Sequence, residues 1–223
     1  MIKYVIFDKD GTLIDTEPFY YKSWYTVGER WGLGGMRENY HSNIAGKGIA
    51  LSIDFLKETF GESLDAQSLM NERMAMVEEM LEGEIPIKRG CIELLDFLKK
   101  HGIKIAVATS TPEDIAVRNL KRLGLYDKTD AVVTGDMVSR GKPHPDIFIE
   151  AGRRIGAVPE ETLVVGDSSF DIIGGHRAGM RAVMVVDQTS LSDEAKPLCL
   201  AVYDSLFGVI DLVSKENNII RGE

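Results

Sequence analysis

Short apolar runs alternate with longer amphipathic stretches along most of this chain, and no other feature restricts its possible folds so strongly. The apolar runs lie at residues 2–7, 103–108, 131–133, 162–165 and 182–186, and each ends at a polar turn. Helical patterns lie between the runs, at residues 91–101, 112–123, 145–155 and 170–178. Strands that alternate with helices of this length predict βαβ units and a parallel sheet. We therefore predict an α/β fold that binds its ligand beyond the carboxyl ends of the strands.

The interval between the first two strands breaks this rhythm. The 71 residues from Asp15 to Ile85 show several helical patterns and no strand pattern. Apolar residues recur there with helical spacing and define two helix faces. The first consists of Ile49, Ile53, Leu56 and Phe60, and the second of Met70, Met74, Val77 and Leu81. We predict a helical module inserted into the α/β domain, with hinges at Asp15–Thr16 and Ile85–Pro86.

Composition excludes several classes of partner. The 223 residues include 26 Lys and Arg against 35 Asp and Glu, a formal net charge of −9, which disfavours binding to nucleic acid or an anionic membrane. No apolar run approaches the roughly 18 residues of a membrane span, and the first run is too short for a signal peptide. Cys91 and Cys199 lie in segments with ordinary helix and loop patterns, so neither a disulfide nor a cysteine metal site is expected. We expect a cytoplasmic monomer.

Two carboxylates, Asp8 and Asp10, follow the first strand directly. Residues two apart in an extended segment point to the same side. At about 4 Å and an effective dielectric constant near 20 their repulsion is about 4 kcal/mol, so the pair needs a cation or a shared proton. Mg²⁺, a hard ion with oxygen ligands, suits a site that must also take a phosphate. The alternative is that strand-to-turn junctions favour Asp and Gly in any protein.

Three later segments also follow strands or helices at this edge of the predicted sheet. Asp167 and Asp171 bracket a helix start, where one can cap the helix and the other bind a metal. Thr109 and Ser110 precede a helix whose first N–H groups can bind an anion, although the hydroxyls can equally be simple caps. Lys142 stands next to a pair of prolines that stiffen its backbone, and the alternative is a solvated surface lysine.

These four segments resemble, in order, the four motifs of the haloacid dehalogenase superfamily. They read Asp8-Lys9-Asp10-Gly11-Thr12, Thr109, Gly141-Lys142-Pro143-His144-Pro145-Asp146 and Gly166-Asp167-Ser168-Ser169-Phe170-Asp171. The inserted module resembles the helical cap of the branch that includes phosphoglycolate phosphatases, small sugar-phosphate phosphatases and β-phosphoglucomutase. The resemblance implies a Rossmann-like core at residues 1–14 and 86–223 with an α-helical cap at residues 15–85.

The resemblance also implies a mechanism. Asp8 would be the nucleophile that forms an aspartyl-phosphate, and Asp10 the general acid and base, with its pKa raised so that it can hold a proton. Mg²⁺ would be held by an oxygen of Asp8, the backbone carbonyl of Asp10, Asp167, and Asp171 directly or through water. The phosphoryl oxygens would be bound by Thr109, the N–H of Ser110, and Lys142.

Rival functions within the family differ at a few positions. Dehalogenases lack the second Asp and phosphonatases replace it with a small residue, so Asp10 argues against both. The phosphomutases carry a histidine in the first cap helix and an arginine after a glycine in the cap loop, and residues 17–21 and 45–49 contain neither. A catalytically idle ligand-binding protein is disfavoured because every catalytic position is filled.

We therefore predict a Mg²⁺-dependent phosphatase that hydrolyses a small phosphorylated metabolite, such as a sugar phosphate. The alternatives are a β-phosphoglucomutase-type enzyme and the idle binding protein. The cap should select the substrate, and Tyr20 and Lys47 are the residues that we expect to contact it.

Overall fold

The computed structural model describes residues 1–36 and 49–220 and contains one parallel sheet. Its strand order is β3-β2-β1-β4-β5-β6, with bounds β1 Tyr4–Phe7, β2 Lys104–Thr109, β3 Ala131–Thr134, β4 Thr162–Gly166, β5 Arg181–Val185 and β6 Cys199–Tyr203. The first five strands confirm the predicted α/β parallel sheet. The sixth strand was not expected, because a loop and the one-turn helix η4 (Lys196–Leu198), rather than a full helix, precede it.

Helices cover both faces of the sheet. One face carries α5 (Cys91–Lys100), α6 (Glu113–Arg122) and α9 (Phe207–Glu216), and the other carries α7 (Asp146–Ile155) and α8 (Ser169–Arg177). Alternate residues of a strand point to opposite faces, so Val5 and Phe7 pack with the first group while Ile6 packs with the second. This double burial explains the continuous apolar character of the central strands. Further one-turn helices are η1 (Tyr126–Lys128), η2 (Gly135–Met137) and η3 (Pro159–Glu161).

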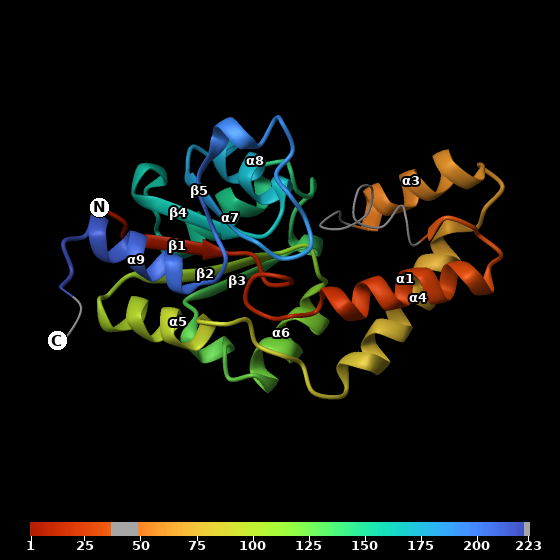
Figure 1. Cartoon of the computed structure of the whole chain (residues 1–223), viewed down its shortest axis with the longest axis horizontal. Helices are drawn as coiled ribbons and strands as arrows, with labels where there is room; N and C mark the ends of the chain where they lie inside the picture. The colour runs from red at the N-terminus through yellow and green to blue at the C-terminus, as the bar shows by residue number, and fades with distance from the viewer. Residues whose placement is uncertain (37–48, 221–223) are drawn as a thin grey trace.

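Before α5, the described part of the chain between β1 and β2 contains three helices, namely α1 (Glu17–Arg30), α3 (Ile49–Phe60) and α4 (Ala66–Leu81). They group together beyond the end of the sheet toward which β1 points (Figure 1). They share an apolar cluster of their own, centred on Trp24, Leu56 and Leu69. We call these three helices the cap; the predicted domain boundaries at residues 14/15 and 85/86 stay a prediction.

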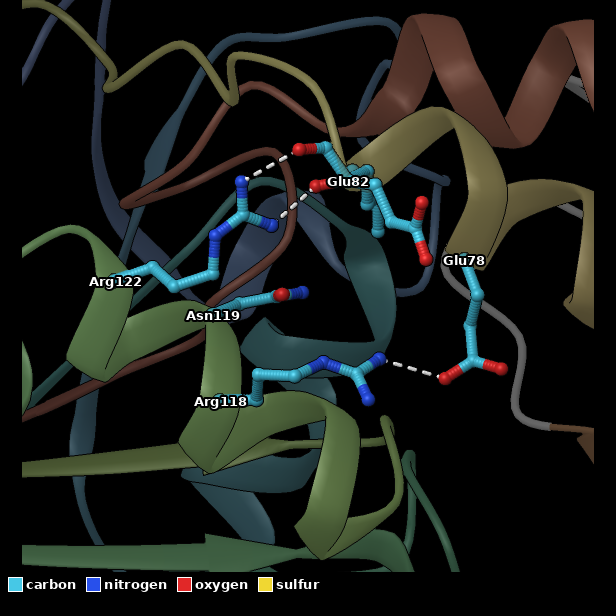
Figure 2. A pocket seen from close by; sticks show the side chains of 6 residues that line it. Glu78, Glu82, Arg118, Asn119 and Arg122 are labelled. Carbon is cyan, nitrogen blue, oxygen red and sulfur yellow. Dashed lines mark hydrogen bonds and ion pairs between the residues drawn. The ribbon is translucent and has the colours of Figure 1, made fainter.

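The two connections between cap and sheet run side by side. Asp15 N–H donates to the carbonyl of Pro86 at 2.8 Å, and Ile14 and Ile87 form an antiparallel bridge. The returning connection is also tied to the core by Arg122 of α6 (Figure 2), which donates to the carbonyls of Leu81, Glu82 and Gly83 at 2.5, 2.9 and 2.8 Å. The last carbonyls of a helix lack partners within it, so Arg122 satisfies the end of α4.

No helix in the described ranges is both long and apolar enough to cross a membrane. Lys47, one of the two residues expected to contact the substrate, lies outside the described residues.

Candidate active site

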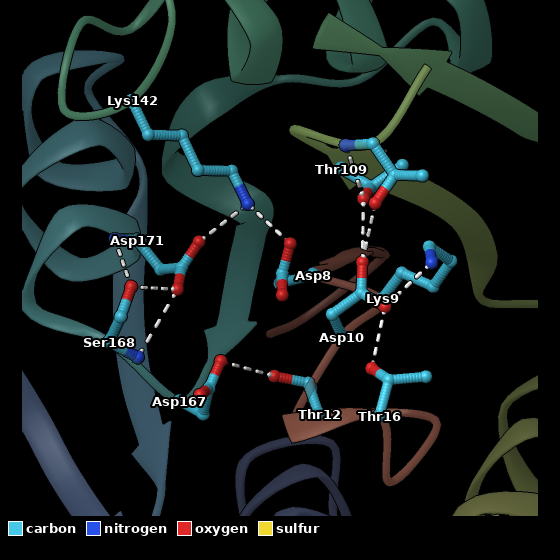
Figure 3. A network of polar contacts seen from close by, with 11 residues as sticks. Asp8, Lys9, Asp10, Thr12, Thr16, Thr109, Lys142, Asp167, Ser168 and Asp171 are labelled. Carbon is cyan, nitrogen blue, oxygen red and sulfur yellow. Dashed lines mark hydrogen bonds and ion pairs between the residues drawn. The ribbon is translucent and has the colours of Figure 1, made fainter. Parts of the chain in front are cut away.

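Asp8 is the first residue after β1, and its carboxylate contacts the ammonium group of Lys142 (Figure 3). Lys142 Nζ lies 2.5 Å from Asp8 Oδ1 and 2.7 Å from Asp171 Oδ1. Lys142 is 4% exposed, so the alternative of a solvated surface lysine is wrong. Burial lowers the pKa of Lys142, but the charges of Asp171 and Asp8 outweigh it and the net shift is upward. Lys142 is therefore a fixed positive charge between two carboxylates.

Asp10 accepts hydrogen bonds from four side chains (Figure 3). Its Oδ1 accepts from Lys9 Nζ at 2.7 Å and Thr16 Oγ1 at 2.6 Å. Its Oδ2 accepts from Thr111 Oγ1 at 2.7 Å and Thr109 Oγ1 at 3.4 Å. Burial alone would raise the pKa of Asp10, but the charge of Lys9 and the hydroxyl hydrogen bonds reverse the shift and lower it. The expected raised pKa is therefore wrong, because the sequence interpretation did not count Lys9.

Asp167 and Asp171 have different surroundings at the start of α8. Ser168 is the N-cap residue, and Asp171 completes a capping box, accepting from Ser168 N–H at 3.2 Å and Ser168 Oγ at 2.5 Å through Oδ2. The other Asp171 oxygen contacts Lys142. Asp167 Oδ1 accepts from Thr12 Oγ1 at 3.3 Å. Asp171 is thus the capping residue of the pair, and it also orients Lys142.

Three carboxylates converge at this edge of the sheet. Asp8, Asp167 and Asp171 each offer an oxygen within 4.8 Å of the others. Burial raises the pKa of Asp8 to about 7; Lys142 opposes this shift, while Asp171 and Asp10 add to it. The pKa of Asp167 is also raised, first by burial and then by Asp8. Buried like charges with only oxygen donors fit a hard divalent cation, which would neutralise them.

The predicted phosphate-binding residues lie beside this cluster. Thr109 ends β2 and is 1% exposed, and its hydroxyl accepts from Thr111 N–H at 3.1 Å and donates to Asp10. Ser110 follows it and is half-buried. The structure thus brings Asp8, Asp10, Thr109, Lys142, Asp167 and Asp171 together, and the phosphate-binding role of Thr109 and Ser110 stays a prediction.

Tyr20 lies on α1, where the cap meets the core. It packs against the apolar clusters of both parts. Burial raises the pKa of Tyr20, and the charge of Asp10 adds to this upward shift. Arg73 of α4 lies over the ring, with Cζ 5.6 Å from its centroid, and contacts Trp24 in the same way at 5.3 Å. Arg73 is 7% exposed, so the cap presents a buried cation next to Tyr20.

Besides Lys9, sequence reasoning missed three residues of this site, of which two hold Asp10 and one lies in the cap. Thr16 occupies the N-cap position of α1, but its side chain makes no capping bond and donates to Asp10 instead. Thr111 carried no signal beyond its hydroxyl. Arg73 did carry a sequence signal, because it lies four residues from both Leu69 and Val77 and so shares the buried face of α4 with them. Met74, expected on the same face as Met70, Val77 and Leu81, is half-buried.

The comparisons with known proteins agree with this geometry. The sequence model of the haloacid dehalogenase-like hydrolase family matches residues 5–185. The chain belongs to this family of hydrolases, which confirms the predicted resemblance.

Similar proteins include two phosphatases of sugar phosphates. The chain is 35% identical to the phosphorylated carbohydrates phosphatase of Thermotoga maritima over 185 residues, 80% of this chain and 82% of that one. It is 36% identical to the fructose-1-phosphate phosphatase YqaB of Escherichia coli over 188 residues, 81% of this chain and 95% of that one. The crystal structure of β-phosphoglucomutase from Clostridium difficile matches with a TM-score of 0.79 over 99% of this chain and 100% of that one. At 23% identity, this last likeness shows the fold alone.

Proposed function

We propose that this protein is a Mg²⁺-dependent phosphatase that hydrolyses a phosphorylated sugar or a similar small phosphomonoester. One observation carries the proposal: a buried nucleophile candidate, Asp8, contacts a fixed cation and stands in a cluster of three carboxylates. Phosphoryl transfer depends mainly on positioning and on positive charge around the transferred group, and this arrangement supplies both. The names of the two relatives support a sugar phosphate as the substrate class.

In the first step, Asp8 attacks phosphorus and the bond to the sugar oxygen breaks, which leaves an aspartyl-phosphate. Lys142 stabilises the negative charge on the phosphoryl oxygens, with Thr109 and the N–H of Ser110 as further donors. Four groups would hold Mg²⁺: the carboxylates of Asp8 and Asp167, the backbone carbonyl of Asp10, and Asp171, which would bind directly or through water. Bound there, Mg²⁺ would supply charge neutralisation for the carboxylates and the phosphoryl group.

In the second step, water attacks the phosphoryl group and gives a proton to Asp10, the bond between the Asp8 oxygen and phosphorus breaks, and inorganic phosphate leaves. Its lowered pKa suits this basic role, because the carboxylate is then ionised at neutral pH. To protonate the leaving oxygen in the first step, Asp10 must already hold a proton. Lys9 and Thr16 favour its ionised form, so Asp10 has to give up its contacts with them before that step. Thr16 lies at the predicted hinge, so movement of the cap would couple to the proton that Asp10 holds.

The cap would choose the sugar. We propose that residues 15–85 move as a domain and that Tyr20 contacts the substrate, with Arg73 beside it on the same face. The buried cation next to the ring suits an anionic or hydroxyl-rich leaving group. Lys47 remains a proposed contact from its position between two glycines in the sequence.

The test is phosphate release from a panel of sugar phosphates with and without Mg²⁺, with Asp8→Asn as the blank. We expect release that requires the metal and that is lost in Asp8→Asn. The panel includes fructose 1-phosphate and β-glucose 1-phosphate, and glucose 6-phosphate is monitored in parallel.

Two outcomes would contradict the proposal. Formation of glucose 6-phosphate without free phosphate would make the protein a mutase. Binding of sugar phosphates without turnover, in a preparation that also binds Mg²⁺, would make it a binding protein.

A further inference from the structure

Asp187 is a buried carboxylate that the mechanism above does not use. It lies in the loop after β5, and its side chain is 5% exposed. Its Oδ1 accepts from Lys88 Nζ at 2.8 Å, which ties the loop to the returning connection of the cap. Its Oδ2 is buried and has no hydrogen-bond partner among the described residues. A buried charged oxygen without a donor is costly, so the position calls for a donor that binds there.

The unpartnered oxygen and an oxygen of Asp167 lie around the same point above Gly11. A methyl group on Gly11 would lie 2.5 Å from Asp167 Oδ2 and 2.9 Å from Asp187 Oδ2, so both carboxylates crowd the same point above the Gly11 α-carbon. Gly11 adopts a φ of 75° and has no side chain, which leaves this point clear. The loop is held in register by Thr189, whose hydroxyl donates to the Asp167 carbonyl at 2.8 Å. Two facing carboxylate oxygens need a cation or a shared donor between them.

Asp187 does not belong to the group of carboxylates that converge within 4.8 Å, which is Asp8, Asp167 and Asp171. Asp187 therefore lies further from the candidate metal position than the three carboxylates that are suited to direct coordination. A hydration water of a hard cation at Asp167 would supply the donor that Asp187 Oδ2 lacks, because Mg²⁺ keeps several waters when bound to carboxylates. Carboxylates that accept from the inner ligands of a metal contribute to its affinity.

We propose that Asp187 is an outer-sphere ligand of the metal site, accepting a hydrogen bond from a water on the cation while Lys88 fixes its other oxygen. The inference rests on the Mg²⁺ site of the proposed function. It adds a residue from the β5 loop to a site otherwise built from the ends of β1 and β4.

The experiment is calorimetric titration of the full-length protein with MgCl₂, together with Mn²⁺ titration followed by electron paramagnetic resonance. We expect Asp187→Asn to weaken binding of both ions by about 10- to 100-fold. Lys88→Met is the matched control, because it removes the same ion pair and keeps the carboxylate; its affinity should equal or exceed that of the parent protein. Asp187→Glu, which restores the charge on a longer arm, should recover part of the loss.

The two variants separate a role in metal binding from a role in anchoring the loop. Equal losses in Asp187→Asn and Lys88→Met, or no loss in Asp187→Asn, would overturn the inference while leaving the Mg²⁺ site intact. Absence of binding by the parent protein would overturn the Mg²⁺ site and the inference together. If Asp187→Asn does not fold, Asp187→Ala takes its place, since Lys88 keeps Asp15 as a partner at 3.7 Å.

Discussion

Lys9 is a fully buried lysine that lies between the two catalytic candidates, Asp8 and Asp10, in the sequence. Its ammonium group lies 2.7 Å from Asp10 Oδ1. A buried charge persists only with a partner, so the two residues stabilise each other in the ionised state. The lowered pKa of Asp10 depends on this pair, because burial alone would raise it. Lys9 therefore links the stability of the β1 loop to the proton that Asp10 can carry.

Lys9→Met should lower the free energy of unfolding by about 3 kcal/mol at pH 7, because it leaves a buried carboxylate without its cation. An acid whose folded pKa is depressed adds stability above its unfolded value, here near 3.8, and that stability is lost as the pH falls through the folded value. The difference between Lys9→Met and the parent should therefore shrink toward pH 3. Urea denaturation at both pH values measures it. Lys104→Met, which breaks only an exposed pair with Asp130, should leave the free energy of unfolding close to that of the parent. Equal stabilities of Lys9→Met and the parent at pH 7 would contradict the prediction.

Polar contacts between α6 and the end of α4 link the core to the cap. Arg122 donates to three consecutive carbonyls, those of Leu81, Glu82 and Gly83, at the end of α4 and the start of the returning connection. Arg118 of the same helix forms a simple ion pair with Glu78 at 2.6 Å, and both side chains are largely exposed. The two arginines therefore differ in what they hold, although they stand one helical turn apart.

Arg122→Met should loosen the end of α4, because three carbonyls lose a charged donor. Amide hydrogen exchange at residues 78–83 should become faster by about tenfold, and kcat and KM should change together if the cap moves on this connection. Arg118→Met removes an exposed ion pair and is the matched control, with exchange within about twofold of the parent. Equal exchange rates in the two variants would show that the connection does not depend on Arg122.

At the scale of the whole molecule, the acidic cluster couples metal binding to pH. Asp8 holds its proton up to a pKa of about 7 in the folded protein, against 3.8 ordinarily, and Asp167 is shifted in the same direction. The metal-free protein therefore binds more protons than the unfolded chain between these values, and it loses stability as the pH rises through this window. A cation must displace those protons, so its binding strengthens with pH.

The rise in melting temperature caused by a fixed Mg²⁺ concentration should therefore be larger at pH 8 than at pH 5.5. Calorimetric scans at the two pH values measure it, with Ca²⁺ as a second ion. A rise that is independent of pH would mean that Asp8 and Asp167 are already ionised without the metal.

The sequence predicts the frame of this molecule better than its details. The central strands and the residues at their ends follow from apolar period and βαβ spacing, because those signals lie within one segment. β6 was not predicted because it lies at the edge of the sheet and its side chains are half-exposed, with Leu200 49% exposed. The partners of Asp10 were missed for other reasons. Thr111 lies 101 residues from Asp10, and a pairing over that distance leaves no local pattern. Thr16 lies only 6 residues from Asp10, but nothing in that spacing shows that the loop after β1 folds back to bring its hydroxyl to the carboxylate.

The central claim is that Asp8 carries the phosphoryl group during hydrolysis. The most direct measurement is rapid acid quenching during turnover of the best sugar phosphate with Mg²⁺, followed by the mass of the peptide that contains Asp8. The account predicts a peptide one phosphoryl group heavier, modified at Asp8, and a larger modified fraction in Asp10→Asn, because the base for the second step is then missing. Rapid phosphate release with an unmodified Asp8 peptide in both proteins would contradict it.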